Sequence, residues 1–117
     1  MSAASALQVQ VTPIPDRIAV ASEPVRIRAS VTNLGTDTVD TELYRSTLFI
    51  DDQPSFDWGM AIGNGAREPL EMELGPGQRV DVERVLSGLV ADAGDHALVL
   101  EVRGVRSPPT TFHIGPT

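Results

Sequence analysis

Apolar residues recur at every second position along most of this chain, which is the period of a strand with one buried face and not that of a helix. The pattern is clearest in residues 25–32, where the polar positions hold Arg, Ser and Thr and the apolar ones are Val25, Ile27, Ala29 and Val31. It returns in residues 98–102. The alternation therefore predicts an all-β protein with central strands in these two segments.

Proline and glycine divide the alternating segments. Pro13 and Pro15 interrupt the first of them, and because proline lacks an N–H donor they place that strand at a sheet edge. Asn33-Leu34-Gly35 predicts a turn, since Asn and Gly tolerate the positive φ of a tight reversal. Between residues 39 and 51 the alternation changes phase near Leu43, which predicts a bulge or a change of sheet.

The run from Leu74 to Leu86 joins a Gly-Pro-Gly turn to a strand that alternates apolar and charged residues. The alternation in residues 70–74 predicts a strand entering this turn, and the pattern beyond Glu83 predicts a slip of register. Residues 52–66 do not alternate and are expected to form a long loop, with a short strand at residues 60–62 as its only regular part. No segment shows a convincing helical period.

The count is about seven short strands separated by turn signals, with no internal repeat. This pattern is typical of an immunoglobulin-like antiparallel β-sandwich. A chain of 117 residues has the size of one domain. We therefore expect residues 1–117 to form a single Ig-like β-sandwich domain of about seven strands.

Four segments, in this order, resemble bacterial Ig-like domains of the CARDB type and, more distantly, the BsuPI-type intracellular proteinase inhibitors. They are Val31-Thr32-Asn33-Leu34-Gly35, Leu48-Phe49-Ile50-Asp51-Asp52, Leu74-Gly75-Pro76-Gly77-Gln78 and Gly94-Asp95-His96-Ala97-Leu98. The resemblance covers roughly residues 25–102 and implies the sandwich fold, because its motifs mark turns and not a binding site. The chain departs from the CARDB pattern in its longer 52–66 segment and in lacking an acidic end after Val102.

Charge and composition narrow the class of partner. Sixteen acidic residues against nine basic ones give a net charge of −7, so the field of the chain repels nucleic acid and anionic lipid headgroups. No stretch approaches the roughly 20 apolar residues of a membrane-spanning helix. We therefore expect neither nucleic-acid binding nor membrane insertion.

The compartment stays open. The chain has no cysteine, which favours a reducing compartment, and its first residues lack the basic and apolar regions of a signal peptide. The protein is expected to be cytoplasmic if Met1 is the native start, and extracellular or periplasmic if a signal peptide has been removed.

Catalytic and metal-binding patterns are weak. The histidines His96 and His113 would both be needed for a zinc site, together with carboxylates from neighbouring strands. Asp51, Asp52 and Asp57 could supply oxygen ligands to calcium, but their spacing matches no calcium loop and a solvated acidic loop is the simpler interpretation. No serine lies in a Gly-x-Ser-x-Gly setting. We expect no enzyme, no metal and no cofactor.

The 52–66 segment holds the candidate binding residues, which are Phe56, Asp57, Trp58 and Met60. Large apolar side chains on a loop above a rigid sandwich are frequent anchors of a binding surface. The alternative is that Trp58 folds back and fills the open end of the sandwich, and its exposure decides between the two.

The function expected from these patterns is a non-catalytic module that binds a protein or a carbohydrate through its loops. Two alternatives remain. The chain could inhibit a protease by presenting an extended loop, either residues 103–110 or the segment around Trp58. It could also be a structural component that joins an assembly, or forms an oligomer, through an exposed edge strand.

Overall fold

The computed structural model describes residues 6–20, 23–64, 67–86 and 92–115. Residues 1–5, on which the question of an export signal depends, and residues 65–66 of the expected loop lie outside this part of the chain. The elements are β1 (Leu7–Ile14), β2 (Arg17–Ile18), β3 (Val25–Asn33), the 3-10 turn η2 (Leu43–Arg45), β4 (Thr47–Ile50), β5 (Gln53–Pro54), α1 (Phe56–Gly63), α2 (Pro69–Met72), β6 (Arg79–Leu86), β7 (Gly94–Val102), β8 (Val105–Arg106) and β9 (Thr110–Ile114).

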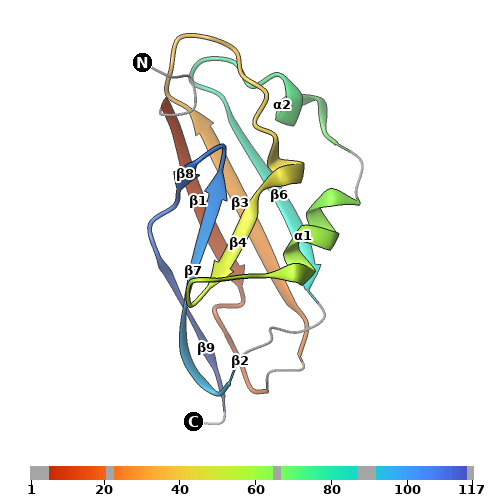
Figure 1. Cartoon of the computed structure of the whole chain (residues 1–117), viewed down its shortest axis with the longest axis vertical. Coiled ribbons are helices and arrows are strands. Elements are labelled where there is room, and N and C mark those ends of the chain that lie inside the picture. The colour runs from red at the N-terminus through yellow and green to blue at the C-terminus, as the bar shows by residue number, and fades with distance from the viewer. Residues whose placement is uncertain (1–5, 21–22, 65–66, 87–91, 116–117) are drawn as a thin grey trace.

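The strands form two sheets that pack on one another. One has the order β1-β3-β6 and the other the order β2-β9-β7-β4-β5, with β8 paired to β7. Figure 1 shows β4 and β7 in front of β1 and β3. The predicted all-β sandwich is confirmed. The strand pairs of the described residues are antiparallel, except that β2 runs parallel to β9 over two residue pairs.

The core between the sheets is aliphatic and follows the alternation of the sequence. On β3, for example, Val25, Ile27, Ala29 and Val31 are at most 1% exposed. Burying one such side chain stabilises the fold by roughly 1.5–3 kcal/mol for Val, Leu or Ile. The strands β3 and β7 lie inside their sheets and β1 lies at an edge, as the alternation and Pro13 predict.

The 52–66 segment is not an irregular loop, and no strand forms at residues 60–62. It contains the short strand β5 and the eight-residue helix α1. Ser55 caps this helix, since its Oγ accepts a hydrogen bond from the Trp58 backbone N–H at 3.2 Å. The sequence shows no helical period here because α1 has only two buried positions. Its two glycines also lower the intrinsic helix propensity of the segment.

The prediction of a strand at residues 70–74 is also wrong, because the chain forms the single helical turn α2 there. Pro69 stands at its first position, where the missing N–H costs nothing. Glu68 and Glu71 form a capping box in which the Glu68 backbone N–H donates to Glu71 Oε2 at 2.6 Å. Only Leu74 pairs as a strand residue would, in an isolated bridge with Val39.

The predicted register slip in β6 does not occur. The ladder with β3 runs unbroken from Thr32↔Arg79 to Val25↔Leu86. The apparent slip arises because Arg84 points inward and donates from Nε to the Ala61 carbonyl at 3.2 Å, while Val85 points outward and is 59% exposed. The phase change predicted near residue 43 is the 3-10 turn η2.

Candidate functional site

The helix α1 and the C-terminal end of β6 form an exposed apolar surface. Phe56 is 78% exposed and Met60 51% exposed, one helical turn apart on α1. A hollow separates the helix from the strand, and we call it the α1–β6 groove. Its lining residues are Asp57, Met60, Ala61, Asn64, Val85 and Leu86.

Trp58 is completely buried, so it does not belong to this surface. Its indole N–H donates to Ser46 Oγ at 3.0 Å, and Ser46 in turn donates to the Leu43 carbonyl at 2.7 Å. Of the two alternatives, the structure therefore supports the one in which Trp58 fills the sandwich. The sequence-predicted binding residues that remain accessible are Phe56, Asp57 and Met60.

The burial of Trp58 is also what exposes Phe56 and Met60. Trp58 and Ile62 are the buried residues of α1 and lie one turn apart. Residues 56 and 60 are offset from them by two positions, which is about 200° around a helix. A helix anchored to the core by Trp58 and Ile62 must therefore present Phe56 and Met60 to solvent.

Asp57 gives the groove a negative charge. It lies in the first turn of α1, where the helix dipole favours a carboxylate. Within the described part of the chain no Arg or His side chain approaches its carboxylate to within salt-bridge distance. The groove therefore combines apolar walls with one carboxylate that can still pair with a cation.

The turn that leads into β5 and α1 is fixed to strand β7 by an aspartate–histidine pair. Asp51 and Asp52 both have positive φ, 50° and 68°, as a two-residue hairpin turn requires. The Asp51 carboxylate pairs with His96 Nδ1 at 2.5 Å and accepts the Ala97 backbone N–H at 2.9 Å. The hydrogen bond from His96 lowers the pKa of Asp51, and the same bond raises the pKa of His96.

The residues considered for metal binding do not converge. His96 pairs with Asp51, whereas His113 pairs with Asp95, its cross-strand neighbour, at 2.6 Å. Asp57 belongs to the groove, away from the Asp51–Asp52 turn. Within residues 6–20, 23–64, 67–86 and 92–115, no three His, Cys, Asp or Glu side chains are grouped so that they could hold a metal ion.

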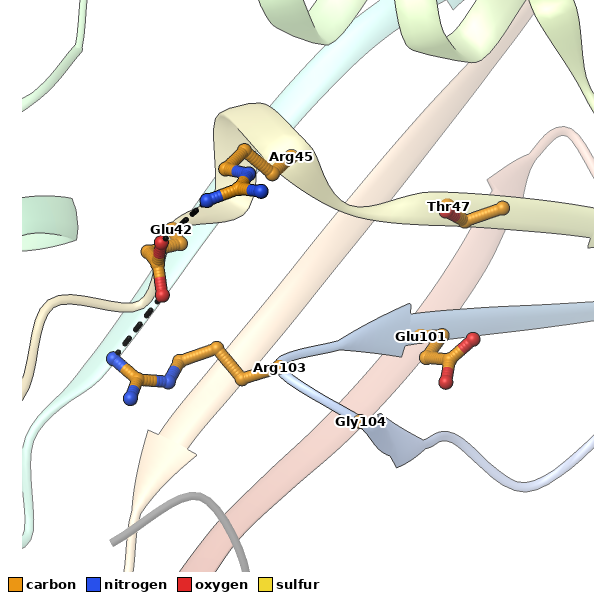
Figure 2. A pocket seen from close by; sticks show the side chains of 6 residues that line it. All are labelled: Glu42, Arg45, Thr47, Glu101, Arg103 and Gly104. Atoms are coloured by element: carbon orange, nitrogen blue, oxygen red, sulfur yellow. Dashed lines mark hydrogen bonds and ion pairs between the residues drawn. The ribbon is translucent and has the colours of Figure 1, made fainter.

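A second hollow lies over the ends of β4 and β7 and is shown in Figure 2. Arg45 and Arg103 approach the same Glu42 carboxylate from two sides, each at 3.4 Å, so that one acid serves both guanidinium groups. Arg103 also donates to the Asp40 carbonyl at 2.7 Å. Both arginines of this hollow are thus already paired within the chain, and its lining residues include no large apolar side chain.

Residues 103–110 do not project as an extended loop. Arg103 and Gly104, with φ of 51° and 81°, form the tight turn between β7 and β8. Ser107 is buried, and its Oγ accepts the Leu100 backbone N–H at 2.9 Å. The segment is therefore held against β7 before β9 begins.

No protein-family model, no curated protein and no solved structure matches the chain. The resemblance to CARDB-type and BsuPI-type domains therefore stays a prediction. Among the described residues, no helix has the length and apolar character needed to cross a membrane.

The sequence pointed to Phe56 and Met60 on the exposed face of α1, of which Met60 lines the α1–β6 groove, but it did not point to Val85 on the other side of the groove. Phe56 and Met60 were candidates because they are large and lie in an irregular segment. Val85 was missed because an apolar residue in a strand is assumed to face the core. Its signal was the break in the alternation of β6, where a valine occupies a position at which the earlier pattern places charged residues.

Proposed function

We propose that this protein is a non-catalytic binding module that recognises a protein partner through the α1–β6 groove. The observation that carries the proposal is the exposed pair Phe56 and Met60 on a helix whose other face is anchored in the core, with Met60 and the exposed Val85 lining the same groove. Exposed apolar residues that lie together on a rigid scaffold are typical of protein interaction sites. A carbohydrate is the less favoured partner, because none of the described residues that line the groove is aromatic, and α1 exposes one aromatic side chain, Phe56.

Anchoring of α1 supports this proposal energetically. A binding surface on a rigid element avoids much of the entropy cost of ordering a flexible loop on association. The Ser55 cap, the buried Trp58 and the fixed Asp51 turn all restrain the helix. Loss of Phe56 or Met60 should therefore weaken binding without changing the fold.

The protease-inhibitor alternative has less support. Neither of the segments considered for it is an extended loop, since residues 103–110 are held to β7 and the Trp58 segment is helical.

The test compares proteins and glycans bound by the wild-type chain and by the double variant Phe56→Ser, Met60→Ser. The matched control is Leu34→Ser, because Leu34 is 65% exposed and lies in the turn after β3, outside the groove. We expect the double variant to lose a specific protein partner that the control retains. Binding that is unaffected by the double variant, or binding to glycans alone, would contradict the proposal.

A further inference from the structure

The outer edge of β6 presents backbone groups that β3 does not use. In an antiparallel pair, residues alternate between those bonded to the neighbouring strand and those that turn their N–H and C=O away. Asn33 donates its backbone N–H to the Gln78 carbonyl at 2.9 Å, which fixes this alternation along the β3–β6 ladder. The β6 residues that turn their N–H and C=O away from β3 are Arg79, Asp81, Glu83 and Val85.

These four residues are exposed. Within the described part of the chain none of their backbone N–H groups donates a hydrogen bond, and of their carbonyls only that of Glu83 accepts one, from the Arg84 side chain at 2.8 Å. Figure 1 shows β6 as the last strand of its sheet, with α1 beside its C-terminal end.

The opposite edge of the same sheet is closed. The bond from Leu34 N–H to the Ala6 carbonyl places the outward-turned backbone of β1 at Leu7, Val9 and Val11. These residues are only 2–5% exposed, and the Val11 carbonyl accepts the Thr110 hydroxyl at 3.0 Å. Of the two edges, β6 is thus the one that another strand can reach.

We propose that β6 binds an extended segment of the partner protein as an additional strand. The segment's backbone would pair with residues 79–85, an apolar side chain at its end would enter the α1–β6 groove beside Met60 and Val85, and a Lys or Arg would face Asp57. A basic and apolar segment also complements the net charge of −7. This inference rests on the proposed function and names its mode of binding, strand addition to a sheet edge.

A second copy of the chain is a poorer occupant of the edge. Symmetric antiparallel pairing of two β6 strands over three or more outward-turned residues has three possible registers. Two of these registers oppose only like charges, Asp81 with Glu83 or Glu83 with Glu83, and like charges directly opposite each other destabilise a sheet. The third opposes Asp81 with Asp81 but also places Arg79 opposite Glu83 on both sides. Because two copies of net charge −7 also repel each other, a segment of different sequence and opposite charge is favoured.

The test selects phage-displayed random peptides on the whole chain and measures the affinity of the enriched peptides for a matched pair of variants. Asp81→Pro removes an outward N–H and no bond to β3, and proline is tolerated on an edge strand in that orientation. Asp81→Asn changes the charge and keeps the N–H. We expect basic peptides with apolar residues at alternate positions, a loss of about tenfold or more in affinity for Asp81→Pro, and at most about a threefold change for Asp81→Asn.

Amide hydrogen exchange on the wild-type chain gives a second measurement that needs no variant. Bound peptide should slow exchange at the outward amides of Arg79, Asp81, Glu83 and Val85 and leave Val80 and Val82, already bonded to β3, unchanged. Peptides that bind Asp81→Pro as well as wild type, or that protect none of the outward amides, would overturn strand addition. If such peptides still require Phe56 and Met60, the proposed function survives. A selection that yields no peptide binder contradicts both.

Discussion

Replacing Trp58 tests whether this residue stabilises the scaffold or contacts a partner. Its side chain is fully buried, and a tryptophan buries roughly 150–250 Å², which at about 25 cal/mol per Å² corresponds to about 4–6 kcal/mol. Measured losses for large-to-small core changes of this kind are about 3–5 kcal/mol. The lost indole bond adds little, because Ser46 keeps its own bond to the Leu43 carbonyl. We expect Trp58→Ala to cost about 4 kcal/mol.

Urea unfolding followed by circular dichroism measures this loss. With an m value of about 1.5 kcal/mol/M, the midpoint should fall by roughly 2–3 M. Trp58→Phe keeps most of the apolar volume and should lower the free energy of unfolding by less than half as much as Trp58→Ala. It replaces the alanine variant in the measurement if that variant does not fold. The control is Phe56→Ala on the exposed face of the same helix, which should change the free energy of unfolding by no more than about 0.5 kcal/mol. Equal losses for Trp58→Ala and Phe56→Ala would refute the assignment of the two faces of α1.

Three further predictions follow from buried or capping contacts. Asn33→Ala should cost about 2–3 kcal/mol in urea unfolding, because its buried side chain donates to the Asp37 and Leu74 carbonyls at 2.8 and 2.9 Å; a loss below about 1 kcal/mol would contradict this role. Ser55→Ala should destabilise α1 by about 1 kcal/mol, seen as faster amide exchange confined to the helix and not across β3 or β7. The stabilisation from the His96–Asp51 pair should be fully present below the usual His pKa of 6.5 and lost as pH rises through the raised pKa of folded His96. It should also be lost as pH falls below the usual Asp value of 3.8, through the lowered pKa of Asp51, and a stability difference between wild type and His96→Gln that does not vary with pH would contradict it.

The sequence predicts the sheets well because their information is periodic. Every second residue is buried along β3 and along residues 98–102 of β7, so the pattern alone gives these strands and their inward faces. The order of the strands and the parallel β2–β9 pair depend on contacts between distant segments, which alternation does not encode. The helices were missed for a different reason, since α1 and α2 are specified by caps and by one or two anchors and not by a repeated pattern.

In the candidate site, too, the residue types could be predicted from the sequence, whereas their positions depend on contacts between distant segments. Phe56 and Met60 could be predicted as large side chains outside the periodic strands, but their exposure could not. That exposure depends on Trp58 reaching Ser46, a contact across twelve residues that only the folded chain defines. Val85 became part of the site through the inward turn of Arg84 toward α1, which is again a tertiary contact.

Charged residues on an edge strand usually discourage pairing with other chains, so the charges of β6 need a physical account. They lie on the outer face of the sheet and are matched within it, since Arg28 pairs with Glu83 at 2.8 Å and Arg79 with Asp81 at 2.9 Å. An added strand would place its own outer side chains next to these pairs. A basic residue beside Glu83 or an acidic one beside Arg79 would be accepted, while the reverse arrangement would be repelled. The charges of β6 would thus select among partner segments, while the backbone edge and the α1–β6 groove supply the affinity.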